Sequence, residues 1–114
     1  MAKLVKSETG YFYWCPACEE THHVRITAPS GNWTFDGNME APTFTPSVRV
    51  TGKQGINKEG RWTGEYKCGP DGKALDLNCH CFITAGNIIF LPDSTHELKG
   101  KTVPLPDVPT FATE

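Results

Sequence analysis

The chain has 114 residues. A single domain of this size buries roughly two-thirds of its unfolded surface, which leaves a thin core. Its 11 basic and 13 acidic residues are spread along the sequence, with a formal net charge of −2, so no basic stripe indicates a nucleic-acid partner. No run approaches the ~20 apolar residues of a membrane span, and the N-terminus MAKLVKSETG lacks a secretory signal, so we expect a cytoplasmic protein without a membrane partner.

The composition predicts the fold class. Eleven Gly and nine Pro accompany many β-branched and aromatic residues, which favours short strands joined by tight turns. We therefore predict one mostly β domain over residues 1–114, made of short antiparallel strands and hairpins with little helix. Five Cys, an odd number, indicate metal or redox chemistry in a reducing compartment rather than a disulfide framework.

In chain order, residues 10–26 (GYFYWCPACEETHHVRI) place bulky strand formers on both sides of a Cys-Pro-Ala-Cys turn. This pattern predicts a strand, a knuckle and a second strand. Two short strands are expected next, over 33–35 and 43–50. Because Pro42 and Pro46 cannot donate ladder hydrogen bonds, the second of these should lie at a sheet edge or contain a bulge.

Residues 52–78 carry a weak signal, and only a hairpin or a mobile loop is expected there. The tail from about residue 100, with three closely spaced Pro in LKGKTVPLPDVPTFATE, is too rich in Pro for a helix interior. We expect it to form an extended arm over the body of the domain.

The Cys-Pro-Ala-Cys turn is the first candidate for chemistry. Such a turn presents two thiolates, Cys15 and Cys18, to one zinc ion. The pair is half of a tetrahedral site, and the other ligands could be Cys79 with Cys81, two apart on a strand, or His22 in place of one of them. A thioredoxin-like redox pair is disfavoured because no βαβ pattern surrounds the turn, and unligated core thiols are the remaining alternative.

The segment NCHCFITAGNIIFLPDSTH (residues 78–96) predicts a β-hairpin. A turn centred on Ala85 and Gly86 makes the numbers of opposite residues sum to 171. Alternation of side chains then places Cys79 and Cys81 on one face, and His80 on the other face with Asp93 diagonally across and His96 just beyond. A slip of one residue would reverse the faces.

A His held by a carboxylate is the arrangement of a general base. It is also how a metal-bound His is oriented, and a hydrogen-bonded His without function is the third interpretation. The candidate nucleophile is Ser47, in PTFTPSVRV, which Pro46 would hold still. Ser94 is expected to make a local turn hydrogen bond.

Three segments together resemble a family of small phage and prophage proteins of unknown function that look like zinc proteins: YWCPACEETHHVRI, NWTFDGNMEAPTFTPSV and CHCFITAGNIIFLPDSTHELKGKTVPLPDV. The resemblance leaves out only residues 52–77. Members often carry the label ammonia monooxygenase, which a chain this small and polar argues against. Relatives also lie beside bacterial ubiquitin-like conjugation genes, so a bacterial or phage-infected host is expected.

The resemblance implies a set of site residues. Cys81 departs from the family pattern, which has a small residue there, so His22 becomes the expected fourth zinc ligand beside Cys15, Cys18 and Cys79. The family positions that remain could form a hydrolytic site; they are Ser47, His80, Asp93 and His96.

These inferences predict a zinc-stabilised peptidase or isopeptidase that acts on a protein or on a ubiquitin-like modifier. One alternative is a non-catalytic adaptor like a zinc ribbon, with Trp33, Trp62 and Tyr66 as its protein-binding face. A second is a zinc metallohydrolase, whose ion keeps an open position for water. A closed metal site, with His80, Asp93 and a hydroxyl within hydrogen-bond reach, would favour the peptidase. No oligomeric state is predicted.

Overall fold

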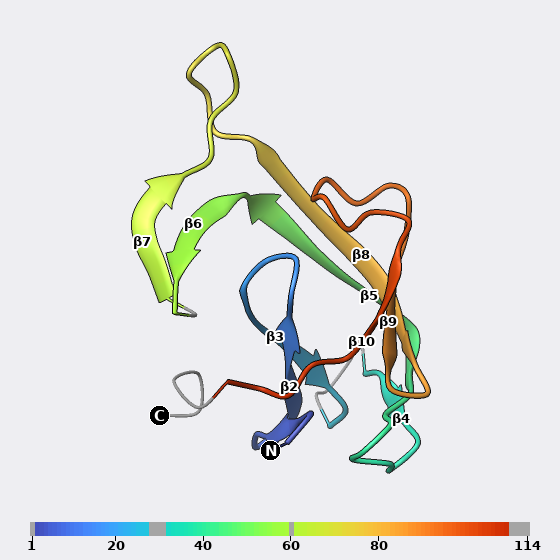
Figure 1. The fold of residues 1–114 in the computed structure, drawn as a ribbon. Helices are drawn as coiled ribbons and strands as arrows, with labels where there is room; N and C mark the ends of the chain where they lie inside the picture. The colour runs from blue at the N-terminus through green and yellow to red at the C-terminus, as the bar shows by residue number, and fades with distance from the viewer. Residues whose placement is uncertain (1, 28–31, 60, 110–114) are drawn as a thin grey trace.

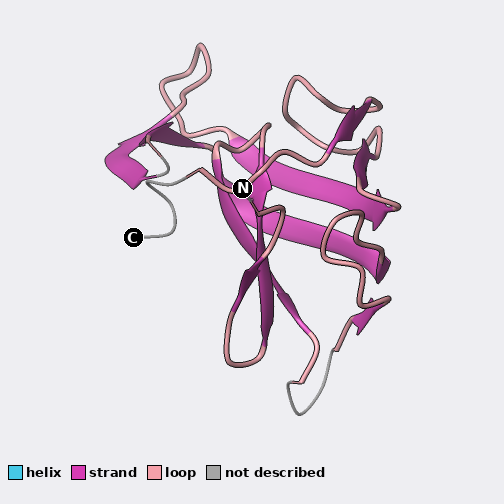
Figure 2. Ribbon diagram, turned by 60° about the horizontal axis from the view of Figure 1, so that its bottom comes forward, coloured by secondary structure: helices cyan, strands magenta, loops and turns pink. Residues whose placement is uncertain are grey.

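A computed structural model describes residues 2–27, 32–59 and 61–109. The described residues form ten strands and no helix, which confirms the predicted fold class (Figures 1 and 2). The strands make three antiparallel sheets, with three, five and two strands. Accordingly, the described part of the chain contains no helix that is long and apolar enough to cross a membrane.

The three-stranded sheet has the order β1-β2-β3 and contains the predicted knuckle. Its strands are β1 (Val5–Lys6), β2 (Gly10–Cys15) and β3 (Glu20–Arg25). The Cys-Pro-Ala-Cys turn joins β2 to β3, where Tyr13 lies opposite His22. At the other end of β2 the strands come so close that a Cβ on Gly10 would lie 1.9 Å from the carbonyl oxygen of Val24. Only glycine fits at that position.

The five-stranded sheet has the order β10-β9-β8-β5-β4. In chain order its strands are β4 (Thr34–Phe35), β5 (Phe44–Lys53), β8 (Asp76–Thr84), β9 (Asn87–Phe90) and β10 (Thr102–Pro104). β4 is shorter than the predicted strand over 33–35, whereas β5 extends past residue 50. Up to residue 109 the Pro-rich tail runs extended, with β10 paired to β9 and the side chains of Leu105 and Val108 buried, and the rest of the predicted arm lies outside the described residues.

β5 contains the predicted bulge. Phe44 lies opposite Ile83 and Val48 lies opposite Cys81, so four steps along β5 correspond to two along β8. Pro46, which follows a cis peptide bond, lies in the extra length. β5 is also paired with β4 at only two positions, Thr45 with Thr34 and Phe44 with Phe35.

Residues 52–78 form a hairpin rather than a loop alone. β6 (Gly55–Lys58) pairs with β7 (Arg61–Tyr66), and the ends of the segment extend β5 and begin β8. Figure 1 shows this hairpin standing away from the five-stranded sheet, beside the loop between β2 and β3. The side chain of Asn57 donates to the carbonyl oxygen of Cys18 at 3.0 Å, which ties the hairpin to the knuckle.

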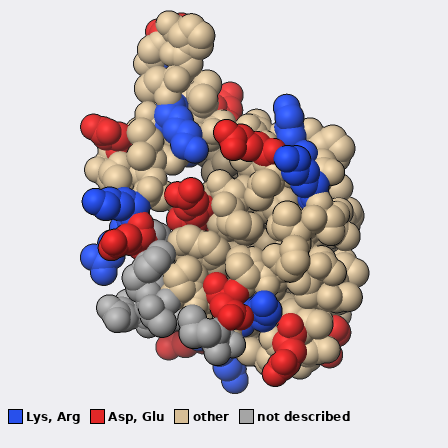
Figure 3. Space-filling view, in the orientation of Figure 1, with Lys and Arg blue, Asp and Glu red and all other residues tan. Residues whose placement is uncertain are grey.

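The core lies between the three-stranded and five-stranded sheets, because both contribute to one cluster of buried side chains. The three-stranded sheet supplies Tyr13, Cys15 and Val24, and the five-stranded sheet supplies most of the rest: Phe44, Val48, Cys79, Cys81, Ile83, Ile88 and Phe90. On the face of the molecule seen in Figure 3, acidic and basic side chains are interspersed.

Candidate catalytic site and metal cluster

The β8–β9 hairpin has the predicted register. Ile83 lies opposite Ile88 and Cys81 opposite Phe90, so the numbers of paired residues sum to 171. The two turn residues, Ala85 and Gly86, both have positive φ, at 48° and 80°. A two-residue turn of this kind matches the twist of the strands and fixes their alignment.

The register divides the start of β8 between two faces. Cys79 and Cys81 are both about 1% exposed and point into the core. His80, between them, points to the opposite face, with its side chain 23% exposed. One short stretch of β8 therefore serves the core side and the outer side of the sheet.

On the outer face, three side chains form a chain of hydrogen bonds. The Ser47 Oγ lies 2.9 Å from His80 Nε2, and His80 Nδ1 lies 3.0 Å and 3.2 Å from the two carboxylate oxygens of Asp93. Because an ionised carboxylate only accepts hydrogen bonds, Nδ1 of the neutral ring carries the hydrogen and Nε2 accepts from the Ser47 hydroxyl. This is the connectivity of a serine nucleophile, a general base and an orienting carboxylate.

Ser47 lies in the irregular stretch of β5, between Phe44 and Val48, where the register with β8 shifts. It is two residues before Arg49, which is paired with His80, so alternation places Ser47 on the same face of the sheet as His80. Bulges redirect side chains and are frequent beside active sites. The carbonyl oxygen of Ser47 also accepts a 3.0 Å hydrogen bond from Trp33 Nε1, which fixes the backbone at this position.

Asp93 is held by Asn78 as well as by His80. Asn78 Nδ2 donates to the Asp93 carbonyl oxygen at 2.9 Å and to its Oδ2 at 3.3 Å, and Asn78 Oδ1 accepts from Arg49 Nε at 2.8 Å. The hydrogen bond from His80, followed by that from Asn78, lowers the pKa of the Asp93 carboxyl below its ordinary value. The carboxylate is thus ionised at neutral pH, as the role requires.

The residues after Asp93 bind the backbone of β8. The hydroxyl of Ser94 accepts from the His80 N–H at 3.1 Å and donates to the His80 carbonyl oxygen at 3.0 Å. Thr95 Oγ1 accepts from the Asn78 N–H at 2.9 Å. The Ser94 side chain therefore does not make the expected local turn bond, since it reaches across to the neighbouring strand. The supporting roles of Asn78, Ser94 and Arg49 were not predicted, although their polar character next to His80 and Asp93 was visible.

His96 lies apart from these hydrogen-bonded residues. Its ring packs edge-on against Phe90 with centroids 4.7 Å apart, and neither ring nitrogen has a hydrogen-bond partner among the described residues. Burial lowers the pKa of this imidazole. The structure thus brings together Ser47, His80 and Asp93 but not His96.

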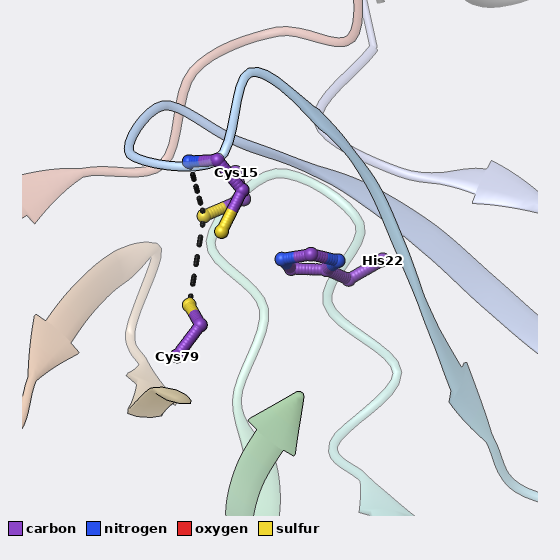
Figure 4. Close-up of side chains that lie close together, drawn as sticks. Cys15, His22 and Cys79 are labelled. Atoms are coloured by element: carbon purple, nitrogen blue, oxygen red, sulfur yellow. Dashed lines mark hydrogen bonds between the residues drawn. The ribbon is translucent and has the colours of Figure 1, made fainter. Parts of the chain in front are cut away.

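The core side of β8 faces a cluster of potential metal ligands. Ligand atoms of Cys15, Cys18, His22 and Cys79 all lie within 4.8 Å of one another, so these four residues could hold a metal ion. Figure 4 shows Cys15, His22 and Cys79 pointing toward one another. The Sγ atoms of Cys15 and Cys79 are 3.8 Å apart. Two sulfurs bound to one tetrahedral zinc at about 2.3 Å would be separated by about 3.8 Å, so the spacing suits a shared ion.

The chemistry of the donors also fits a cation. Nε2 of the buried His22 has no hydrogen-bond partner among the described residues. Hydrogen bonds from Cys18 and Cys79 lower the pKa of the Cys15 thiol, whereas the contact with Cys15 raises the pKa of each of those two thiols. Three crowded thiols share protons in this way because they cannot all ionise without a positive charge among them.

The other two cysteines lie outside the cluster. Cys81 contacts the Tyr13 hydroxyl at 3.8 Å, and burial raises the pKa of its thiol to about 12, so it remains protonated. His22 rather than Cys81 therefore completes the group of four. Cys68 is exposed, and its Sγ lies 3.5 Å from the Tyr66 carbonyl oxygen.

A cavity of about 270 Å³ lies away from Ser47. Its lining includes Cys18, His96, Trp62 and Tyr66, and none of the three hydrogen-bonded residues Ser47, His80 and Asp93 is among the lining residues that the structure describes. The rings of Trp62 and Tyr66 pack together with centroids 5.1 Å apart and are partly exposed. Trp33 instead lies against the Ser47 backbone. The three aromatic residues proposed for an adaptor face are therefore divided between two places.

Comparison with protein families matches residues 2–91 to the family described as bacterial ubiquitination-like system serine protease (BubE). The chain belongs to the BubE family. The match includes Ser47, His80 and all four residues of the metal cluster, and Asp93 follows just after it. The BubE description agrees with the expected relation to ubiquitin-like conjugation genes. Comparisons with curated proteins and with solved structures find no match.

Proposed function

We propose that this protein is a serine peptidase or isopeptidase of a bacterial ubiquitination-like system. The observation that carries the proposal is the chain of hydrogen bonds from Ser47 through His80 to Asp93, in a chain of the BubE family. No second candidate is needed to account for the arrangement on the outer face of β8.

The reaction follows from the roles of the three side chains. Ser47 Oγ attacks the carbonyl carbon of the peptide or isopeptide bond while His80 Nε2 takes the hydroxyl proton. Asp93 orients the ring and stabilises the imidazolium, which then protonates the leaving amine and leaves an acyl-serine. Water, deprotonated by His80, hydrolyses this ester and releases a carboxylate and the free serine.

The substrate is proposed to be a protein, namely a ubiquitin-like modifier or its conjugate. The site supports this because His80 and Asp93 lie on an open sheet face, with 54% of the Asp93 side chain exposed, and not inside the described cavity. Small-molecule substrates are usually bound in concave pockets. An open site suits the protruding tail of a larger substrate.

The metal is proposed to be a structural zinc ion held by Cys15, Cys18, His22 and Cys79. Three Cys and one His form a closed zinc site without a position for water. The cluster also lies on the opposite face of β8 from Ser47, so it has no direct route to the substrate carbonyl. Both features favour the serine peptidase over the metallohydrolase.

The test uses a ubiquitin-like precursor from a neighbouring operon, with cleavage followed by mass spectrometry. Wild-type protein should cleave it and should be labelled by a fluorophosphonate at Ser47. Ser47→Ala and His80→Ala should each lower the rate by roughly 10³-fold or more while keeping the metal and the fold. Full activity of Ser47→Ala would indicate an attacking water instead, and loss of metal in His80→Ala would make His80 a ligand.

A further inference from the structure

The two edges of the five-stranded sheet differ. At one edge, β10 bonds to β9 through alternate residues, since Leu105 N–H donates to Gly86 and the Lys101 carbonyl accepts from Phe90. By the same alternation Val103 also faces β9, whereas the backbone groups of Thr102 and Pro104 point outward, and Pro104 has no N–H to offer. A proline at an outward position prevents another strand from pairing with that edge.

At the other edge lies β4, which is so short that most of β5 is left open. β4 covers only Phe44 and Thr45, and in the described part of the chain no strand pairs with the outer side of β5 from Ser47 onward. Arg49 and Thr51 are exposed there. Figure 1 shows β5 continuing well beyond its short partner β4.

The direction of the backbone groups on β5 follows from its partner, β8. The carbonyl oxygens of His80 and Asn78 accept from Leu91 and Thr95, so the backbones of these β8 residues face away from β5. The residues paired with them on β5, Arg49 and Thr51, must therefore point their own N–H and C=O groups outward. Further along the same alternation, the Gln54 backbone N–H donates to the Leu75 carbonyl oxygen at 2.9 Å.

The open edge ends at Ser47. By the same alternation the Ser47 carbonyl points outward, and there it accepts the hydrogen bond from Trp33 Nε1 at 3.0 Å. The indole thus occupies the acceptor that a further ladder bond would use. An added strand that pairs with Arg49 and Thr51 could therefore not continue its backbone hydrogen bonds to β5 at Ser47, the candidate nucleophile.

We propose that the substrate binds as an added strand on this edge. An extended segment of the protein substrate pairs with the outward backbone groups of Arg49 and Thr51, and its scissile carbonyl reaches Ser47 where the ladder stops. This inference rests on the proposed function. Strand addition binds through main-chain hydrogen bonds, so it suits a flexible tail of a protein rather than a small molecule.

Amide hydrogen exchange in the Ser47→Ala protein tests this directly. In the free protein, the Val48 and Val50 amides should exchange slowly because they face β8, whereas the Arg49 and Thr51 amides should exchange fast. Adding the ubiquitin-like precursor from a neighbouring operon should slow exchange at Arg49 and Thr51 by at least tenfold. Unchanged exchange with bound precursor would overturn the inference. Protection that rises with protein concentration alone would also overturn it, since a second copy of this chain would then occupy the edge.

Two proline variants form a matched pair in the full-length protein. Thr51 and Thr102 are both exposed and both point their N–H groups outward, at opposite edges of the sheet. Thr51→Pro should lower kcat/KM for precursor cleavage at least tenfold, and Thr102→Pro should change it less than twofold. Equal effects would contradict edge binding.

The outcomes separate the two proposals. If wild-type protein neither cleaves the precursor nor is labelled at Ser47, the proposed function fails and strand addition fails with it. If Ser47 is labelled and the precursor is cleaved, but neither the exchange pattern nor the proline pair responds as expected, only strand addition fails. Should Thr51→Pro not fold, the exchange experiment decides.

Discussion

Asn78 joins more of the outer site than any residue predicted from the sequence. It donates to Asp93 through its amide nitrogen, accepts from Arg49 through its amide oxygen, and exchanges backbone contacts with Thr95. Since Asp93 is exposed and lies beyond the end of β9, these contacts hold the carboxylate at the imidazole. Asn78 thus acts as a positioning residue.

Replacing Asn78 should therefore impair the chemical step. Asn78→Ala removes both side-chain bonds to Asp93, and small displacements of catalytic groups are costly, so kcat should fall on the order of tenfold or more with KM nearly unchanged. Kinetics of precursor cleavage would measure both constants. Asn87→Ala, in the same hairpin, is the control, because among the described residues the Asn87 side chain donates only to the nearby Ala85 carbonyl oxygen. A change in KM alone would assign Asn78 to substrate binding instead.

At the residue scale, prediction succeeded where the strands are regular. The pairing of His80 with Asp93 followed from the alternation of side chains along a hairpin of known register. His96 was misplaced because β9 ends at Phe90, so alternation no longer applies to the segment that follows. That segment folds back and brings the His96 ring against Phe90.

At the scale of elements, the β8–β9 turn sets the alignment that places His80 on the outer face of the sheet and Cys79 on the core face. Ala85 and Gly86 both adopt positive φ, a conformation that glycine accepts at little cost. The Gly86 N–H donates to the Pro42 carbonyl oxygen at 3.0 Å, so the turn also contacts the start of β5. The turn thereby links the strand of His80 with the strand of Ser47.

Substituting this glycine should destabilise the domain. In Gly86→Ala the new Cβ would lie 3.0 Å from Ala41 Cα and 3.1 Å from Ala41 Cβ, in addition to the cost of a φ of +80°. Gly100→Ala is the matched control, because φ is +74° and no described atom lies within 4 Å of its Cβ. We expect the free energy of unfolding, measured with urea, to fall by about 1–2 kcal/mol in Gly100→Ala and by clearly more in Gly86→Ala. Equal losses would mean that the contact with Ala41 relaxes freely.

The elements differed in how far they could be predicted. An edge position or a bulge in this strand was predicted from Pro42 and Pro46, and the register shift lies around Pro46, since Pro42 precedes β5. The β6–β7 hairpin was left open between hairpin and loop because every residue of β7 is exposed. Without a buried face, its sequence shows no alternation of apolar and polar residues from which a strand could be assigned.

For the whole molecule, the metal cluster connects the two main sheets. Cys15, Cys18 and His22 come from the β2–β3 hairpin and Cys79 comes from β8, so an ion bound there would tie the three-stranded sheet to the five-stranded sheet. The next residue along β8 is His80. The position of the proposed general base would therefore depend on a strand that a bound ion holds in place.

Metal removal should therefore abolish both the fold and the activity. Structural zinc sites contribute apparent free energies on the order of 10 kcal/mol, comparable with the total stability of roughly 5–15 kcal/mol of a small domain. We expect about one zinc per chain by elemental analysis, and loss of the cooperative thermal transition after chelation.

The cysteine variants test which residues hold the ion. Cys79→Ser should release the zinc and abolish the thermal transition. Cys68→Ser should keep both the zinc and the melting temperature, because Cys68 lies outside the cluster. Cys81→Ser should keep the zinc, because the Cys81 thiol contacts Tyr13 and is not a member of the cluster. If Cys81→Ser releases the zinc, Cys81 and not His22 is the fourth ligand. If the protein without metal melts cooperatively at the same temperature, the thin core alone holds the two sheets together.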